Sequence, residues 1–188
     1  ILNATFASNI NPSFLRAEVL SSIASVALML IAFLWSEGKS TTKSQNLQFD
    51  NQGLIMEDGL TEEIRNELGW GSHLLLTATP AATLIIYWDH KVLLRRGLIS
   101  NDEFIPGTTC INAQKSKRLI SLPNTKFFPA KYEFDCIVKG LPSLIIYPLD
   151  NRGWVILGGC VEKCFSKSDE KWITGWSERL KDILIKSN

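Results

Sequence analysis

The sequence contains few of the residues that carry catalytic or metal chemistry. It has two histidines and four cysteines, and the cysteines form no C-x-x-C motif, no C-x-x-C-H haem-attachment motif and no paired zinc spacing. Charge of one sign is also lacking, since 20 basic and 19 acidic residues give a formal net charge of +1. Without a positive excess, no long-range field gathers phosphates. We therefore expect no metal site and no nucleic-acid partner.

Apolar residues, by contrast, are plentiful. The 188 residues are 45% hydrophobic and 10% aromatic, a composition that is unlike that of disordered or collagen-like chains. After a membrane anchor is subtracted, a chain of this length can fill one core of ordinary size but not two. We therefore expect a single folded domain.

An uncharged run covers residues 19–36, between Glu18 and Glu37. As a helix with a rise of about 1.5 Å per residue, this run spans roughly 27 Å, close to the hydrocarbon thickness of a bilayer. A buried core helix would keep a polar stripe, whereas only three serines interrupt this run. A cleaved signal peptide would need small residues where Phe-Leu-Trp stands at 33–35. The run therefore predicts a transmembrane helix over residues 14–37.

The charges beside this helix indicate its orientation. Arg16 precedes the apolar run, whereas Lys39 and Lys43 follow it, and this excess places the C-terminal part on the cytoplasm-like side. The polar stretch after the helix is rich in small residues, which is typical of a linker. The predicted organisation is a pre-membrane segment at 1–13, the transmembrane helix at 14–37, a linker at 38–46 and a soluble domain at 47–188.

Helices are predicted near both ends of the soluble domain. Residues 61–76 begin with a capping residue and two acids and then place apolar residues on one face. Residues 169–186 follow Ser168 as the N-cap, with acids in the first turn and lysines late. Trp172 and Trp176 recur at helical spacing in this second helix, so we expect both to be buried against a sheet.

Two hairpins and a further short strand are predicted between these helices. Each hairpin joins two β-branched and aromatic runs through a turn rich in Asp, Asn, His or Gly. The first pairs 83–88 with 92–96 through Asp89 and His90, the second pairs 144–149 with 154–157 through 150–153, and the further strand covers 118–122. This order predicts an α+β domain in which helices flank one side of an antiparallel sheet, as in GAF and PAS-like sensor domains.

Two stretches of the sequence resemble one protein family. They are ELGWGSHLLLTATPAATLIIYWDHKVLLRRGLI at 67–99 and LPSLIIYPLDNRGWVILGG at 141–159, and they follow a helix that begins NPSFLRAEVL. Together they resemble the paired paralogous factors called cofactor assembly of complex C, which are found in chloroplasts and cyanobacteria. The second stretch also looks like the closing hairpin of a GAF domain.

The resemblance implies a membrane-anchored assembly factor that assists covalent haem attachment to cytochrome b6 during cytochrome b6f biogenesis. The implied partners are a paralogous subunit, with which it forms a heteromer, cytochrome b6 and the membrane. The implied location is the thylakoid membrane of a chloroplast or cyanobacterium, with the soluble domain on the stromal or cytoplasmic side. Haem would be at most a transient ligand, and the resemblance transfers no catalytic residue.

Three residues are candidates for contact with haem or its acceptor. His73 could be a core residue, a partner-facing residue or an axial haem ligand. Cys160 and Cys164 could form a disulfide, act as a thiolate pair that holds the acceptor cysteine, or be two unrelated buried thiols. No nucleophile, base and orienting group are recognisable together, so we expect a non-catalytic factor rather than an enzyme. The alternative is a membrane-tethered, GAF-like sensor that encloses a small molecule between sheet and helix.

Overall fold

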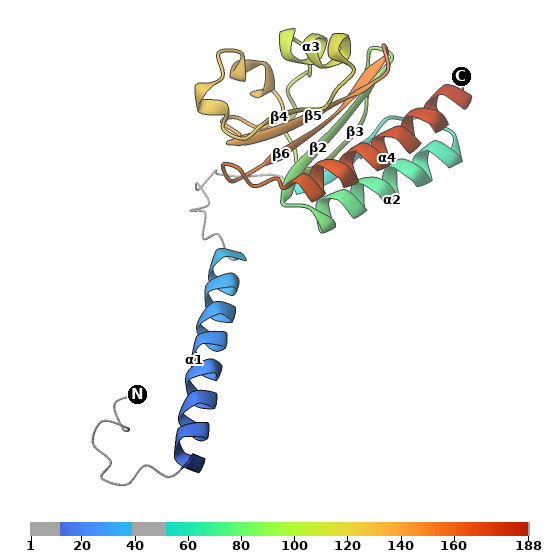
Figure 1. The fold of residues 1–188 in the computed structure, drawn as a ribbon. Helices are drawn as coiled ribbons and strands as arrows, with labels where there is room; N and C mark the ends of the chain where they lie inside the picture. The colour runs from blue at the N-terminus through green and yellow to red at the C-terminus, as the bar shows by residue number, and fades with distance from the viewer. Residues whose placement is uncertain (1–11, 39–51, 188) are drawn as a thin grey trace. The chain divides into compact units, whose positions relative to one another are not determined.

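The computed structural model describes residues 12–38 and 52–187, which belong to two separate units. The first unit contains the helix α1 (Pro12–Gly38), drawn in blue in Figure 1. Its window Arg16–Phe33 has a mean hydropathy of 1.7, and none of these residues is buried. As the uncharged run predicts, α1 is long and apolar enough to cross a membrane.

The serines of α1 satisfy their hydroxyl groups within the helix. The Oγ of Ser22 donates a hydrogen bond to the carbonyl oxygen of Glu18 at 2.8 Å, and the Oγ of Ser25 donates one to that of Ser21 at 2.9 Å. Because these two hydroxyl donors need no water, Ser22 and Ser25 cost little in an apolar environment.

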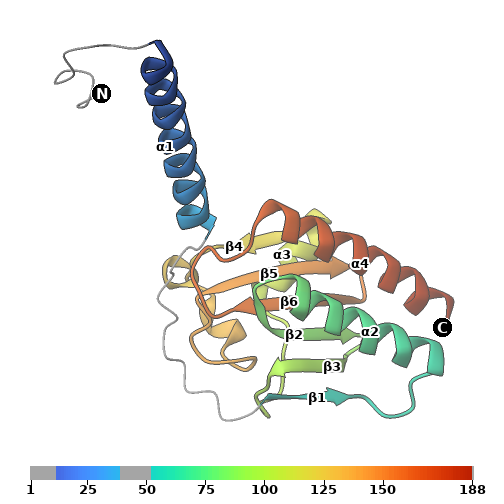
Figure 2. The ribbon, with the colours of Figure 1, turned by 90° about the horizontal axis from the view of Figure 1, so that it is seen from below.

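The second unit is built on a six-stranded antiparallel sheet with helical segments on both faces (Figures 1 and 2). The strand order is β1-β3-β2-β6-β5-β4. The strands are β1 (Gln52–Met56), β2 (Ala81–Trp88), β3 (Lys91–Leu98), β4 (Ile120–Leu122), β5 (Ser143–Leu149) and β6 (Gly153–Gly159). The helices are α2 (Glu62–Ala78), α3 (Thr108–Ser116) and α4 (Lys167–Lys186), with the 3-10 turns η1 (Thr125–Phe127) and η2 (Lys131–Phe134).

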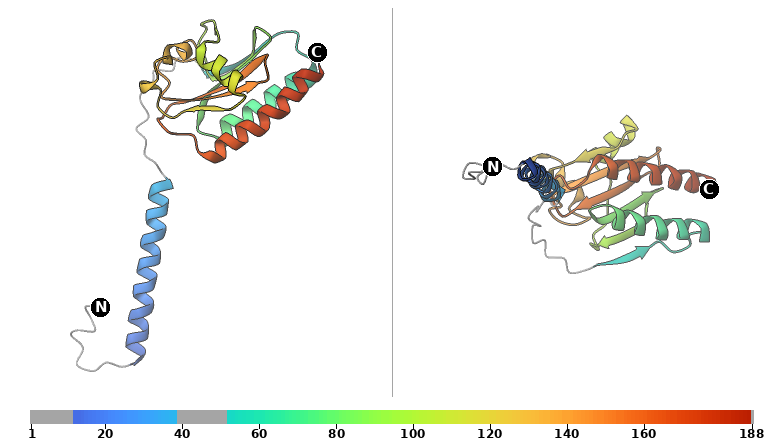
Figure 3. Two further views of the ribbon diagram at one scale, coloured as in Figure 1. Left: turned by 45° about the horizontal axis from the view of Figure 1, so that its top comes forward. Right: turned by 60° about the horizontal axis from the view of Figure 1, so that its bottom comes forward.

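The central strands are buried on both sides, which explains their nearly continuous apolar sequences. Ile145 and Val155 face the layer formed by α2 and α4, whereas Leu144 and Trp154 face the layer formed by α3 and the 3-10 turns. Successive residues thus alternate between two cores, as the period of a β-strand requires. Figure 3 shows α2 and α4 together on one face of the sheet.

Both predicted hairpins are confirmed. The first turn places Asp89 and His90 at φ 46° and 65°, the left-handed conformation of a two-residue type I′ turn. Arg152, from the second turn, donates from Nε to Asp89 Oδ1 at 2.7 Å, and its guanidinium lies 4.8 Å from the ring centre of Trp88. The two turns therefore brace each other at one end of the sheet. The short strand predicted at 118–122 is β4.

The predicted helices correspond to α2 and α4, but the cap of α4 was assigned wrongly. The N-cap is Ser166 rather than Ser168: its Oγ accepts from Asp169 N at 3.2 Å, while Asp169 Oδ2 accepts from Ser166 N at 2.7 Å. This reciprocal capping box needs an acceptor three residues after the cap. Ser168 has Lys171 at that position. The helix therefore begins at Lys167, two residues before the predicted start.

The prediction that both tryptophans of α4 are buried is right for one and wrong for the other. Trp176 is only 5% exposed, whereas Trp172 is 55% exposed. The buried stripe runs through Ile173, Trp176, Ser177, Leu180 and Leu184. Trp172 precedes this stripe by one residue, about 100° around the helix, so its side chain emerges on the outer surface.

Two elements were not predicted from the sequence. The edge strand β1 shows no alternation of buried and exposed residues, and α3 is a short helix on the face of the sheet opposite α2 and α4. Helices therefore flank both faces rather than one. The predicted linker at 38–46 and the predicted start of the soluble domain at residue 47 fall outside the described residues, apart from Gly38.

The approach of α2 to α4 depends on Gly71, and a substitution there should be costly. A Cβ added to Gly71 would lie 1.8 Å from Trp176 Nε1, whereas a Cβ on Gly69 would meet nothing within 4 Å. We expect Gly71→Ala to lower the free energy of unfolding by about 1–3 kcal/mol through overpacking. The matched variant Gly69→Ala should raise it by up to about 1 kcal/mol, because alanine favours the helix. Urea unfolding of both variants measures the difference, and equal stabilities would contradict this packing.

Candidate functional site

A buried carboxylate joins the two helices that cover one face of the sheet. Glu67 of α2 is 7% exposed, and its Oε1 accepts a hydrogen bond from Trp176 Nε1 of α4 at 3.0 Å. Its other oxygen accepts from Arg179 Nε at 3.1 Å and lies 2.9 Å from Arg179 Nη2. The buried charge is therefore paired, and both of its oxygens have donors.

Arg179 links this buried contact to the surface. Its guanidinium lies 5.9 Å from the ring centre of Trp70, an exposed residue of α2. The same side chain thus binds Glu67 and lies against an indole ring, so both its charge and its plane have partners. Trp70 is thereby supported from one side while 57% of its surface remains in solvent.

The outer surface of the helix pair is hollowed beside these residues. A groove of about 490 Å³ lies between α2 and α4 and is lined by Trp70, Leu74, Trp172, Gly175 and Arg179, among others. A second hollow of about 430 Å³ shares Trp70 and Arg179 with it and is also lined by Glu63, Asn66 and Ile183. We call the two hollows together the tryptophan groove.

The tryptophan groove has the composition of a binding surface. Trp70 and Trp172 are both more than half exposed, although tryptophan in a monomeric protein is mostly buried. Large exposed aromatic residues grouped on one surface indicate an interaction site, and tryptophan and arginine are among the residues that most often dominate interface energies. The groove is open along its outer side, which suits an extended partner such as a helix.

His73, one of the residues predicted from the sequence, lies on the exposed side of α2 and is therefore not a core residue. Its Nδ1 lies 3.3 Å from Arg96 Nη2, and the Arg96 guanidinium also donates to Gly69 O at 2.7 Å. The neighbouring guanidinium can donate to Nδ1 in the neutral imidazole. The roles of His73 as a partner contact or haem ligand stay predictions.

Cys160 and Cys164 lie just after β6, and both are free thiols. Cys164 Sγ is 3.0 Å from the Oγ of Ser143 on β5. Burial raises the pKa of both thiols, and the proximity of Cys164 raises the pKa of Cys160 further. Since the reactive species is the thiolate, burial works against the thiolate-pair hypothesis and favours two half-buried thiols.

The tryptophan groove was not predicted from the sequence, although a signal for it was present. The buried stripe of α2 contains Ile64, Glu67, Leu68, Gly71, Ser72 and Leu75. Trp70 lies off this stripe, as Trp172 lies off that of α4. A large apolar residue outside the periodic stripe is therefore the feature that would have indicated an interaction surface.

Comparisons with known proteins show a family match and a related plant protein. The family model described as cofactor assembly of complex C, CCB2/CCB4, matches residues 1–180. The chloroplastic cofactor assembly of complex C protein CCB4 of Arabidopsis thaliana is 23% identical over 177 residues. That match covers 88% of this chain but 60% of the Arabidopsis protein, so the chain spans less than two thirds of its relative.

Solved structures with similar folds include a GAF domain. The type II free methionine-R-sulfoxide reductase of Thermoplasma acidophilum has a TM-score of 0.55 at 18% identity, covering 66% of this chain and 94% of that protein. The GAF domain of the cyanobacteriochrome TePixJ has a TM-score of 0.51 at 9% identity, covering 73% and 98% respectively. At these identities the similarity shows a common GAF-like fold and nothing about activity.

The two tryptophans of α4 offer a matched pair for a test of stability. Trp176→Ala removes a buried indole and one donor to Glu67, so we expect a loss of about 3–5 kcal/mol in the free energy of unfolding. Trp172→Ala removes an exposed ring and should cost less than about 1 kcal/mol. Chemical denaturation of both variants measures these values. A similar loss for both would mean that Trp172 is packed in solution.

The raised thiol pKa values predict slow alkylation with a marked pH dependence. At pH 7 the folded protein holds less thiolate at Cys160 and Cys164 than an exposed cysteine, so iodoacetamide should react at least about tenfold more slowly than with a free thiol. The rate should climb as pH approaches the raised pKa values. Peptide mass spectrometry follows each cysteine separately, with urea-unfolded protein as the control. A rate that has already levelled off at pH 7 would contradict the raised values.

Proposed function

Because the chain belongs to the family described as cofactor assembly of complex C, CCB2/CCB4, we propose that it is an assembly factor for the cytochrome b6f complex. In this role it assists covalent haem attachment to cytochrome b6 at the thylakoid membrane. The match over residues 1–180 and the chloroplastic Arabidopsis relative support this assignment. The protein contributes binding and positioning rather than bond-making chemistry.

The tryptophan groove is the observation that carries this proposal, and its partner is a related member of the same family. Trp70 and Trp172 each present an exposed indole on the same side of α2 and α4. A related subunit would have its own pair of helices at the corresponding place. Two such pairs can pack as a four-helix layer, a common way to bury apolar helix surfaces in homologous pairs.

The contacts beneath the groove make such binding favourable. Arg179 is already paired with the buried carboxylate of Glu67, so covering it does not strand an unpaired charge. The guanidinium also holds the Trp70 ring from one side, which reduces the rotamer freedom that would be lost on binding. A preorganised aromatic surface of this kind is typical of interface hot spots.

The apolar helix α1 supplies the membrane anchor in this proposal. With an unburied window of mean hydropathy 1.7, it can span the bilayer, and the lysines that follow it favour the stromal or cytoplasmic side for the folded domain. The anchor holds the domain close to membrane-bound cytochrome b6, which raises the effective concentration of the two proteins.

The alternative function, a small-molecule sensor, would need a ligand cavity between the sheet and a helix. The layer between the sheet and α3 is filled by side chains that include Phe104, Cys110, Phe134 and Trp154, each at most 7% exposed. The corresponding layer under α2 and α4 is filled by residues that include Leu68 and Trp176. This packing favours the assembly factor over the sensor.

A deletion strain of a photosynthetic host tests the proposal. We expect deletion to abolish the cytochrome b6 band in a haem-peroxidase stain after denaturing electrophoresis, while the two b-type haems remain. The intact gene should restore the band, and Trp70→Ser/Trp172→Ser should not, because the loss of two interface tryptophans weakens binding by at least about thirtyfold each.

The control is Ile105→Ser/Ile111→Ser, which removes two exposed apolar residues outside the groove. It should restore the band fully at the same protein level by immunoblot. A normal haem band in the deletion strain would refute the assembly role. Full restoration by the tryptophan variant would refute only the groove as the partner surface.

A further inference from the structure

A second hollow lies on the opposite side of the sheet, where η1 and η2 meet the start of β5. This cavity, of about 320 Å³, has a floor made by Phe134, Leu141 and Leu144, all of them buried. Pro142 and Val138 complete its apolar part. The interior therefore suits a hydrocarbon group rather than a polar ligand.

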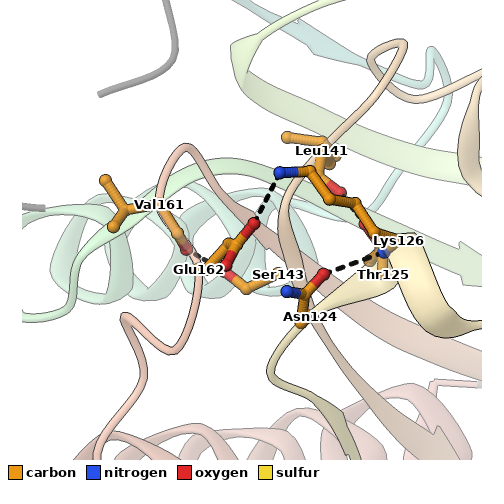
Figure 4. Close-up of polar contacts among 7 residues, drawn as sticks. All are labelled: Asn124, Thr125, Lys126, Leu141, Ser143, Val161 and Glu162. Carbon is orange, nitrogen blue, oxygen red and sulfur yellow. Dashed lines mark hydrogen bonds and ion pairs between the residues drawn. The ribbon is translucent and has the colours of Figure 1, made fainter. Parts of the chain in front are cut away.

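Three lysines surround this apolar floor. Lys126, Lys131 and Lys139 line the cavity, against a single carboxylate, Asp135, whose Oδ1 accepts a hydrogen bond from Gly140 N at 3.2 Å. Lys126 forms an ion pair with Glu162 at 2.8 Å (Figure 4). The cavity rim is therefore positively charged, and an anionic group there would be attracted.

Hydrogen bonds hold the frame of the cavity in place. Thr125 donates from Oγ1 to the carbonyl oxygen of Leu141 at 2.5 Å and from its amide to that of Pro142 at 2.9 Å. Ser143 donates from Oγ to the carbonyl oxygen of Val161 at 2.7 Å, beside the Lys126–Glu162 pair in Figure 4. The site is thus formed before any ligand binds, which lowers the cost of binding.

Two aromatic residues extend from the same segment into solvent. Phe127, beside Lys126, is 86% exposed, and Tyr132, beside Lys131, is 71% exposed. An almost fully exposed phenylalanine gains nothing from water, whereas aromatic rings are favoured at the interface of a bilayer. Aromatic residues interleaved with lysines are the composition of surfaces that bind anionic membranes.

We propose that this cavity binds an anionic membrane lipid. The headgroup lies among Lys126, Lys131 and Lys139, the first part of an acyl chain covers the floor, and Phe127 and Tyr132 enter the headgroup region. A lipid is favoured over a soluble anion because the floor is apolar and the exposed aromatic residues need an apolar environment. The helix α1, long and apolar enough to cross a membrane, keeps the domain near such lipids.

Hydrogen exchange of the full chain in nanodiscs tests the proposal. The nanodiscs contain phosphatidylcholine alone or phosphatidylcholine mixed with anionic phosphatidylglycerol, and the readout is amide exchange in residues 123–141. Since a basic residue near an anionic surface contributes roughly fivefold, we expect exchange to be about tenfold slower with the anionic lipid. Lys131→Gln/Lys139→Gln should abolish the difference. The matched variant Lys115→Gln/Lys186→Gln removes the same charge elsewhere and should keep it.

Three results would overturn the proposal. The first is equal exchange in both nanodiscs. The second is the same slowing in neutral nanodiscs after addition of inorganic phosphate, which would indicate a site for soluble anions. The third is slowing that depends on an added partner protein and not on lipid composition, which would assign the segment to a protein interface. None of these results bears on haem attachment, so the test is independent of the proposed function.

Discussion

The contact that the proposed interaction surface depends on is the one between Glu67 and Trp176. It joins α2 to α4 beneath the surface, and the neighbouring Gly71 lets the indole come close enough to form it. Arg179 completes the pairing of the carboxylate and at the same time lies against Trp70. Removing one member would leave a buried charge or donor without its partner, at a cost of several kcal/mol. Stability and the shape of the groove therefore rest on the same few atoms.

Much of the fold follows from local sequence, and its exceptions have physical causes. The hairpins were predictable because turn residues such as Asp89 and His90 adopt positive φ between β-branched runs. The helix α3 was not, because its cap is supplied from elsewhere: Glu133 accepts from the amides of Gly107 and Thr109 at 2.7 and 2.9 Å. Such a cap becomes visible only when the chain is folded. The exposure of Trp172 was missed because helical spacing was followed without locating the centre of the buried stripe.

The candidate site could be predicted only in part for a related reason. Sequence patterns select residues by type, and they selected His73, Cys160 and Cys164, which the structure places on different elements beside Arg96 and Ser143. The groove instead consists of residues of ordinary type in an unusual place. Family membership supplies the role in assembly, and the structure supplies a surface through which such a factor can act without a catalytic centre of its own. The GAF-like scaffold provides two rigid, neighbouring helices for that surface.

Site-specific photo-cross-linking in membranes tests the central claim most directly. A benzophenone amino acid replaces Trp172 in one strain and Ile105 in a control strain, each expressed in the photosynthetic deletion host. The account predicts that position 172 forms a cross-link to the related family member, identified by mass spectrometry, whereas position 105 does not. A cross-link to that protein from position 105 alone would contradict it.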